Sequence, residues 1–350
     1  MTLAIESGLL TKRFRPVRSI RAALLGRPRE PDRVAVDRVD LAIPHGQVFG
    51  LLGQNGAGKT TLVRILTTLL LPTAGTARVD GIDVTVDPRA VRSRIGLING
   101  DERSFYWRLS GRHNLEFFGA LRHLDEATTA AAIDRLAARL GMSEHLDRPF
   151  ARLSTGQRQS LAIMRGLIDE PRILFMDEPT RSLDPISASR LRRFVADVVV
   201  GELERTVVLA THSMPEAEEL CDRLAFIQDG RIVAQGSVAE LRRTIGYGTR
   251  CELRVRHAPA DVAARLADVV GVAGVAATTI EPPSHDGATV VVRMTLTAGD
   301  ALAEVMRRLV RADADVLACE TGELSLEEIY VRTLGSTAAP APSTVPQVAR

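Results

Sequence analysis

The sequence predicts an α/β core with a largely parallel sheet, followed by a smaller α+β domain. Short apolar runs alternate with helix-patterned segments over about the first 240 residues, and this alternation is typical of parallel sheets covered by helices. After Gly246 the order of predicted strands and helices changes. A chain of 350 residues is long enough for two domains that each bury a core.

Four segments carry the strand pattern of the predicted core. They lie at residues 34–43, 47–52, 172–177 and 206–211. The first alternates apolar and polar residues, as a half-buried strand does, and the others are short apolar runs. A helix is predicted from near Gly58 until Pro72 stops it. An alanine- and leucine-rich stretch at residues 115–140 predicts a helical subdomain that interrupts the sheet.

The second domain is predicted to have the order β-α-β-β-α-β, which is typical of a ferredoxin-like fold. Its strands are expected at residues 249–256, near Val275 and Val290, and at residues 315–320, with helices at residues 261–270 and 301–310. A closing helix follows, with Ser325 as its N-cap and Glu328 at the capping-box position.

The composition shifts along the chain give the expected boundaries. We expect a first domain at residues 1–244, a small α+β domain at 245–334 and a disordered, proline-rich tail at 335–350. The helical subdomain occupies about residues 103–170, and a basic insertion occupies about residues 15–33. This insertion is either a solvated loop or a surface for anionic lipid or a membrane-bound partner.

The bulk composition argues against several classes of protein. The net charge of +2 is too small to indicate a nucleic-acid binder. The three cysteines lie far apart with no metal-ligand spacing, which favours a reduced, cytosolic chain. We find neither a signal-peptide pattern nor an uncharged apolar run of the roughly 18 residues that cross a bilayer. If the protein works at a membrane, another chain must do the spanning.

Residues 53–60, GQNGAGKT, match the phosphate-binding pattern G-x-x-x-x-G-K-[ST] between a predicted strand and a predicted helix. Glycines let backbone N–H groups converge on phosphate oxygens at a helix N-terminus. Lys59 is one of only two lysines in the chain, and its compact charge fits among crowded amides where an arginine fork is too wide. The expected nucleotide-binding residues are Gly53, Gln54, Asn55, Gly56, Ala57, Gly58, Lys59, Thr60 and Thr61.

An acidic pair follows the predicted strand at residues 172–177. Asp177 and Glu178 stand at its carboxyl end, where ligands of open α/β sheets bind. Asp177 is placed to coordinate Mg²⁺, which the Thr60 hydroxyl would also hold, and Glu178 is placed to polarise the attacking water as a general base. These residues predict a site for a nucleoside triphosphate with magnesium.

Three further motifs make the sequence resemble the ATP-binding-cassette family. They are LSTGQ at residues 153–157, SLD at residues 182–184 and THS around His212. Together with the phosphate loop and the acidic pair they stand in the family's order, over about residues 5–244. The resemblance implies a P-loop NTPase core of the cassette type, hydrolysis of ATP with Mg²⁺, and contact of His212 with the γ-phosphate.

The resemblance also implies a dimer, formed with a second copy of the chain or a homologue. Two chains would sandwich two nucleotides head to tail, and completing the site on dimerisation would link hydrolysis to motion. The residues expected to act across this interface are Ser154, Thr155, Gly156, Gln157 and Asp184. Thr155 takes the place of the first of two glycines that the family usually has.

Two other positions depart from the family's pattern. Gly100 stands where the family commonly has a glutamine, and Asn99, Asp101 and Glu102 are open alternatives for that glutamine's contact with Mg²⁺ or water. The aromatic residue expected to stack on adenine is Phe14, which the basic insertion separates from the next strand. A role for Phe14 in the core is the alternative.

An aromatic run, Phe105 to Trp107, follows the position of the missing glutamine. It is either a local core cluster or, by the family's geometry, an anchor for a short cytoplasmic helix of the membrane subunit. The two readings differ in whether these rings are exposed.

The single cassette, the stretch at residues 111–121 and the closing segment at 325–334 resemble bacterial drug-resistance (daunorubicin-type) export ATPases. We therefore expect an ATPase at the cytoplasmic face of the membrane that powers separate transmembrane permease subunits, and no nucleic-acid partner. Export of polysaccharide or lipid-linked glycan is the alternative within transport. A non-transport cassette protein of translation or DNA repair is less favoured, because the chain has one phosphate loop and lacks coiled coils and zinc cysteines.

Overall fold

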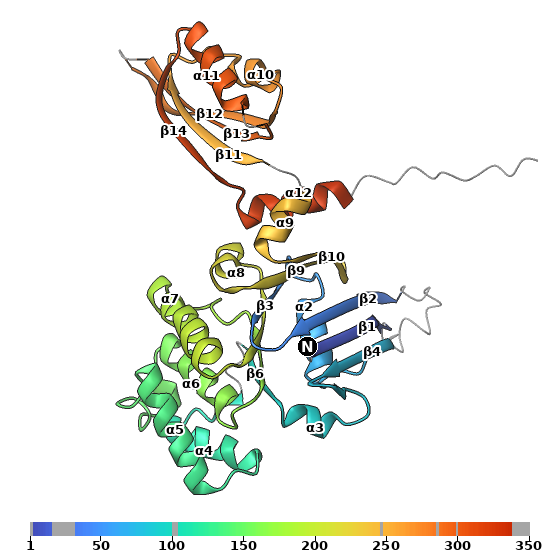
Figure 1. The fold of residues 1–350 in the computed structure, drawn as a ribbon. Helices are drawn as coiled ribbons and strands as arrows, with labels where there is room; N and C mark the ends of the chain where they lie inside the picture. Colours follow the sequence, from blue (N-terminus) through green and yellow to red (C-terminus); the bar gives the residue numbers. More distant parts are fainter. Residues whose placement is uncertain are drawn as a thin grey trace, which may run out of the picture. The chain divides into compact units, whose positions relative to one another are not determined.

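The computed structural model describes residues 3–15, 32–99, 104–245, 248–284, 287–298 and 300–337. The chain divides into two compact units, Met1–Val238 and Ala239–Arg350 (Figure 1). The division falls at the start of a short helix, α9 (Val238–Ile245). Most of the expected basic insertion, and residues 338–350 of the expected tail, lie outside the described residues.

The first unit contains a six-stranded, largely parallel sheet in the order β10-β9-β3-β8-β7-β6. Its strands are β3 (Val48–Leu52), β6 (Ile95–Asn99), β7 (Ile173–Asp177), β8 (Thr206–Thr211), β9 (Arg223–Gln228) and β10 (Arg231–Gly236). All neighbours are parallel except β10 with β9. Every residue of β3 and β8 is buried, as expected for apolar strands covered on both faces. The predicted parallel core is confirmed.

A second, antiparallel sheet in the order β2-β1-β4-β5 accompanies it. Its strands are β1 (Leu3–Phe14), β2 (Arg33–Pro44), β4 (Ala74–Val79) and β5 (Ile82–Asp83). Helix α2 (Lys59–Leu66) contributes Leu62, Ile65 and Leu66 to one apolar core with strands of both sheets. Of these strands only β2 was predicted, because β1 mixes polar and apolar residues and pairs with β2 through several register shifts.

Helices α4 (Gly111–Leu121), α5 (Glu126–Leu140) and α6 (Thr155–Leu167) form the helical subdomain (Figure 1). The predicted helical stretch is thus broken in two, because the Asp125 side chain caps α5 by accepting the Thr128 N–H. The unit is completed by a 3₁₀ turn (Phe150–Arg152), α3 (Pro88–Arg92), α7 (Pro185–Arg193) with its π-helical continuation (Phe194–Glu202), and α8 (Met214–Leu220).

The second unit is built on a four-stranded sheet in the order β12-β13-β11-β14, in which all neighbours are antiparallel. Its elements are β11 (Thr249–Arg256), α10 (Val262–Ala267), β12 (Val272–Ser284), β13 (Gly287–Leu296), α11 (Ala301–Arg311), β14 (Asp315–Glu323) and α12 (Leu326–Thr337). The predicted order of strands and helices is confirmed, and α10 and α11 pack on the sheet in one apolar core.

The closing helix has the predicted capping box. The Glu328 N–H donates to Ser325 Oγ, and the Ser325 N–H donates to Glu328 Oε2. Helix α12 runs to Thr337, so residues 335–337 are helical where the tail was expected to begin. Within the described ranges, no helix combines the length and the apolar character needed to cross a membrane.

Candidate nucleotide-binding and catalytic site

The predicted strand, loop and helix around the phosphate pattern are confirmed: β3 ends at Leu52 and α2 begins at Lys59. A Cβ added to Gly53 would lie 2.3 Å from the Ile227 carbonyl oxygen. Gly58 has a φ of +113°, and a Cβ there would lie 2.4 Å from the Ala35 carbonyl oxygen. Neither position accepts a side chain. No side chain caps the N-terminus of α2, so its first N–H groups are left for an anion.

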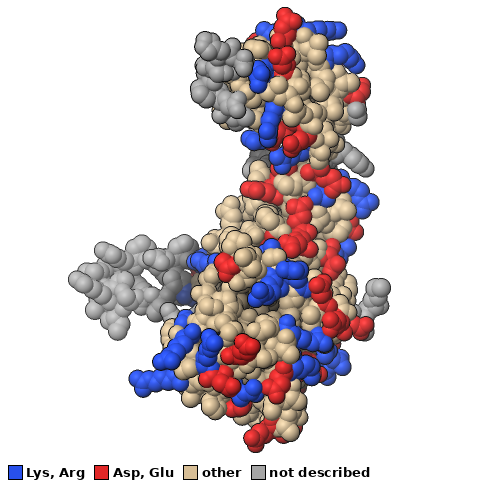
Figure 2. All heavy atoms as spheres, turned by 90° about the vertical axis from the view of Figure 1, so that its left-hand side faces the viewer, with Lys and Arg blue, Asp and Glu red and all other residues tan. Residues whose placement is uncertain are grey.

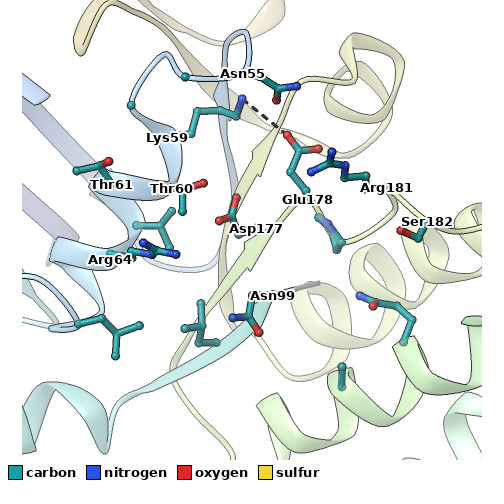
Figure 3. Close-up of a pocket in the computed structure, with 18 of the residues that line it drawn as sticks. Asn55, Lys59, Thr60, Thr61, Arg64, Asn99, Asp177, Glu178, Arg181 and Ser182 are labelled. Atoms are coloured by element: carbon teal, nitrogen blue, oxygen red, sulfur yellow. Dashed lines mark ion pairs between the residues drawn. The ribbon is translucent and has the colours of Figure 1, made fainter. Parts of the chain in front are cut away.

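Lys59 is only 5% exposed and is held over this loop. Its Nζ donates to the Gly53 carbonyl at 2.6 Å and to the Gln54 carbonyl at 3.2 Å. The same ammonium lies 3.7 Å from Glu178 Oε1 (Figure 3). Burial lowers the pKa of Lys59, and the charges of Glu178 and Asp177 oppose that shift. The ammonium therefore stands between the loop carbonyls and the acidic pair.

Asp177 is the last residue of β7 and pairs in register with Asn99 of β6 and Ala210 of β8. Burial raises the pKa of Asp177, while a hydrogen bond from Thr60 acts in the opposite direction. Asp177 Oδ1 is buried and has no hydrogen-bond partner among the described residues. An orphaned carboxylate oxygen beside a threonine hydroxyl is a ready pair of oxygen ligands for a hard cation.

Glu178 follows at once and adopts a left-handed backbone, with φ of +52°. Its N–H donates to the Ala210 carbonyl at 2.8 Å, which fixes this conformation. Its Oε2 lies 2.6 Å from Nδ1 of His212, on the turn after β8. A glutamate in this region carries strain of order 1 kcal/mol. The strained turn aims the Glu178 carboxylate at His212 and Lys59 together.

Hydrogen bonds of the Thr211 hydroxyl hold the turn that carries His212. The Thr211 hydroxyl donates to Glu216 Oε2 at 2.6 Å and accepts the Ser213 N–H at 3.1 Å. Glu216 lies on α8 and is 3% exposed. The backbone on both sides of His212 is therefore tied to a buried carboxylate.

A cavity of about 1050 Å³ opens over the loop and the acidic pair. Of the predicted site residues it is lined by Phe14, Gln54, Asn55, Gly56, Gly58, Lys59, Thr60, Thr61, Thr155, Asp177 and Glu178. Gly53, Ala57, Ser154, Gly156, Gln157, Asp184 and His212 do not line it. Five cationic side chains and two acidic ones line it, and such a surplus favours a polyanion. Figure 3 labels three of the cations, Lys59, Arg64 and Arg181, beside the acidic pair.

Four cationic lining residues were not predicted as part of the site: Arg33, Arg64, Arg158 and Arg181. Arg181 lies in the loop directly after the acidic pair, and Arg64 lies one turn beyond Thr60 on α2. Proximity to a recognised motif was therefore a usable signal for these two. Arg33 and Arg158 are brought in only by the fold.

Phe14 is 41% exposed and lines the cavity, with Lys12 Nζ 5.4 Å from its ring centroid. It ends β1 and is not among the buried residues of the core. Its position is that of an exposed ring at the rim of the cavity, not of a core residue.

The signature residues begin α6. Ser154 and Gln157 form a capping box: the Gln157 N–H donates to Ser154 Oγ, and the Ser154 N–H donates to Gln157 Oε1. Asp184 caps α7 by accepting the N–H groups of Ile186 and Ser187. A Cβ on Gly156 would lie 2.9 Å from Ser187 Oγ, so the two helix starts touch. The signature and Asp184 thus form a second cluster, separate from His212 and Glu178.

Of the three candidates for the missing glutamine's contact, only Asn99 is described, and it lines the cavity. Gly100, Asp101 and Glu102 lie outside the described residues. The aromatic run divides: Phe105 is 4% exposed and stacks on Phe150, with centroids 4.7 Å apart. Tyr106 and Trp107 are half exposed. The core reading therefore holds for Phe105, and the docking reading of Tyr106 and Trp107 stays a prediction.

The residues at this site suit a magnesium ion. In the described part of the chain no three His, Cys, Asp or Glu side chains gather in a metal-binding group. Magnesium does not require one, because it keeps several waters and binds through one or two protein oxygens plus substrate phosphates. Thr60 and Asp177 fit that pattern.

Comparison with known proteins agrees with this geometry. Residues 36–181 match the family described as "ABC transporter". Daunorubicin resistance ATP-binding protein DrrA3 of Streptomyces coeruleorubidus is 41% identical over 230 residues, covering 66% of this chain and 72% of that protein. Daunorubicin/doxorubicin resistance ATP-binding protein DrrA of Streptomyces peucetius is 35% identical over 308 residues, covering 87% and 89%.

Among solved structures, the dimeric ATP-binding cassette MJ0796 in a post-hydrolysis state with ADP and Pi matches with a TM-score of 0.58 and 21% identity. It covers 67% of this chain and 98% of that chain. At this identity the likeness concerns the fold alone. The sequence matches carry the assignment: the chain belongs to the ATP-binding-cassette transporter family and is one of its ATP-hydrolysing subunits.

Proposed function

We propose that this ATPase works as one half of a head-to-tail dimer that powers export through separate transmembrane permease subunits at the cytoplasmic face of the membrane. The observation that carries the proposal is the convergence of Lys59, Asp177, Glu178 and His212 at the carboxyl ends of β3, β7 and β8. Hydrolysis there needs little from the protein except positioning and charge.

The phosphate chain of ATP lies on the loop from Gly53 to Thr61, with Lys59 as a point charge between the β- and γ-phosphates. Its ammonium already has two loop carbonyls as acceptors. Thr60 and Asp177 hold Mg²⁺, which neutralises charge on the β- and γ-phosphates when it is bound. Phe14 stacks on the adenine ring at the rim of the cavity, a role that its 41% exposure supports.

Glu178 acts as the general base that orients and polarises the attacking water. His212 contacts the γ-phosphate and holds the Glu178 carboxylate through its Nδ1, 2.6 Å away. The Thr211 and Glu216 contacts keep the His212 turn in place. Together these residues join the carboxylate to the phosphate end of the nucleotide.

The second subunit, either another copy or a homologue, supplies Ser154, Thr155, Gly156 and Gln157 to the nucleotide held by this chain. Two features support that arrangement. The signature residues lie at the N-terminus of α6, the positive end of that helix's dipole, and the solved cassette MJ0796 is a dimer with ADP and Pi. Asp184, which caps α7 beside Gly156, links the signature to the interface.

The membrane partner docks on exposed apolar side chains of the helical subdomain. These are Tyr106, Trp107, Leu109, Phe117 and Leu121, each between 36% and 60% exposed. Export is supported by the names of the two drug-resistance relatives. We propose no nucleic-acid partner, since acidic and basic side chains are interspersed over the face that Figure 2 presents.

The domain organisation that we propose is a cassette ATPase at residues 1–244 and a ferredoxin-like domain at 245–334. The strand order β12-β13-β11-β14 and its antiparallel pairing support the second assignment. This domain regulates the ATPase or lengthens the dimer contact. The proposed tail follows the last residue of α12, Thr337.

The test is ATPase activity of the purified chain, alone and with the membrane protein encoded beside its gene. Tyr106→Ala should abolish the stimulation given by the membrane protein and keep basal turnover within about threefold. Val86→Ala, which also removes an exposed apolar side chain, is the matched control. Equal loss of basal and stimulated activity in the Tyr106 variant would show that the docking surface is misplaced.

A further inference from the structure

The side chain of Asn99 lines the cavity one residue before Gly100, the position at which the family commonly has a glutamine. Asn99 ends β6, and its register partner on the neighbouring parallel strand is Asp177. Both side chains line the cavity, and Figure 3 shows Asn99 at the same sheet edge as Asp177. Asn99 is therefore the neighbour of Asp177 on strand β6.

Asn99 is held by an arginine of the signature helix. From α6, Arg165 donates through Nη2 to Asn99 Oδ1 at 3.3 Å and through Nη1 to Ser104 Oγ. Its guanidinium also lies 4.9 Å from the ring centroid of Phe105 and 5.4 Å from that of Phe118. Within the described part of the chain, these hydrogen bonds and ring contacts fix the plane of the guanidinium.

This arrangement decides which way the Asn99 amide faces. Arginine is a donor at every nitrogen, so the atom that it meets must be the amide oxygen of Asn99. No hydrogen bond from the Asn99 amide nitrogen is made within the described part of the chain. The carbonyl oxygen is engaged by a cation, and a second cation would be repelled there. What remains for the cavity is the N–H₂ group.

We propose that Arg165 orients Asn99 so that its amide N–H donates to the terminal phosphate of ATP, and that Asn99 is not a magnesium ligand. Glu178 marks where the terminal phosphate lies, because the general base stands next to the reacting phosphorus. Asp177, between Glu178 and the β6 edge, places Asn99 beside that phosphate. The proposal rests on the phosphate site proposed at Lys59 and adds to it a direct donor, Asn99, and a positioning residue, Arg165.

The test compares nucleotide affinity with and without metal. A phosphate donor acts on ATP whether or not magnesium is present, whereas a metal ligand matters only when magnesium is present. Asn99→Ala should weaken ATP binding about tenfold in both EDTA and Mg²⁺, the cost expected for one hydrogen bond to a charged group. ADP binding should change less than twofold. A loss seen only with Mg²⁺, or an equal loss for ADP and ATP, would overturn the donor assignment.

Arg165 is tested by asking whether it acts through Asn99. Arg165→Met keeps an unbranched side chain beside the rings and removes the guanidinium that donates to Asn99 and Ser104. It should reproduce the loss of Asn99→Ala, and the double variant should lose no more than either single one. Arg165→Lys retains one donor and should recover part of the affinity. Additive losses would contradict the positioning role, as would unchanged ATP affinity in Arg165→Met.

Two controls separate this inference from its premise. Arg135→Met removes an exposed arginine of the helical subdomain that pairs with Glu170, and it should leave all affinities unchanged. Lys59→Ala should weaken ATP binding strongly with and without metal. If Lys59→Ala binds ATP normally, the phosphate site itself is wrong. If Lys59→Ala fails to bind while Asn99→Ala binds normally, the inference on Asn99 alone is wrong.

Discussion

The cavity of the first unit and the sheet of the second unit shift the pKa of a carboxyl group in opposite directions. At the cavity, Asp177 Oδ1 is buried without a hydrogen-bond partner among the described residues, and burial raises the pKa of that carboxyl. On the sheet, Glu252 lies between Arg293, at 2.8 Å, and Arg250, at 3.2 Å. These hydrogen bonds, with that to Arg293 foremost, lower the pKa of Glu252.

The difference shows what each region is built to do. A carboxylate whose surroundings disfavour its charge gains from a ligand that compensates it, so a poorly satisfied cluster indicates a binding site. A carboxylate already satisfied by two arginines gains nothing further from a ligand. The second unit combines such pairs with a continuous apolar core, as a region selected for stability does.

The largest effect is expected at the general base. Glu178→Gln should lower kcat by at least about a hundredfold, because a positioned base contributes that much or more. ATP binding should persist, since the phosphate loop is untouched, and the closed dimer should accumulate. Single-turnover phosphate release and size measurements with ATP check both statements. A variant that turns over normally would remove Glu178 from the mechanism.

Lys59→Arg should also abolish most hydrolysis, by about a hundredfold, with the fold retained. The lysine is 5% exposed and meets two loop carbonyls, so a wider guanidinium displaces the loop that cradles the phosphates. ATPase assays and thermal melting together measure this. Retained activity would mean that the loop accommodates a guanidinium at position 59. The explanation that only a compact ammonium fits there would then be wrong.

The second unit should respond in stability and not in catalysis. Leu253 is fully buried in its core, so Leu253→Ala should destabilise that unit by about 3 kcal/mol. At temperatures at which the second unit stays folded, basal ATPase activity should be unchanged, because the cavity is lined by residues of the first unit alone. Val331→Ala, at a 62% exposed position on α12, is the control. A matching loss of ATPase activity would show that the folding of the second unit is coupled to catalysis in the first.

A smaller effect is expected in how the stability contributed by Asp177 and by Glu252 depends on pH. The folded protein holds the Asp177 proton to a higher pH than the unfolded chain does. Stability from this group therefore increases as the pH falls from above its folded pKa towards about 3.8. Asp177→Asn should remove that trend and raise the melting temperature at pH 7 by about 1–3 °C while abolishing magnesium-dependent hydrolysis. A lower melting temperature would contradict the sign.

Glu252 should give the smallest effect, of opposite sign. Its lowered pKa means that its stabilisation is present above about pH 4.5 and is lost as the pH falls through the folded pKa. Glu252→Gln should reduce the melting temperature at pH 7 by less than about 2 °C, as ion pairs near the surface are weak. The change should vanish in acid. A change at pH 7 that persists in acid would contradict the linkage to this carboxylate.

The sequence predicted the parts of the molecule whose chemistry is local. The phosphate loop, the strand before Asp177 and the capping box at Ser325 depend on a few adjacent residues, so their patterns are readable. The β1 strand was missed because its pairing contains register shifts that no periodicity describes.

Contacts between segments far apart in the sequence also could not be predicted. Nothing in the order of residues places Arg165 on Asn99, 66 positions away, or Arg158 over the Trp107 ring. The Phe105 ring looked equivalent to its two neighbours, and only the arrangement of the helices decides that it is buried. Such facts depend on how the helices pack, which the one-dimensional pattern does not encode.

The left-handed backbone of Glu178 has a consequence for any attempt to evolve this protein. Asn and Gly adopt a φ of +52° far more readily than Glu does. A library selected only for heat resistance should therefore drift at this codon towards Gly or Asn, and one selected for transport should return Glu. Sequencing the survivors of the two screens would reveal, at a single position, how much stability the protein forgoes to keep its chemistry.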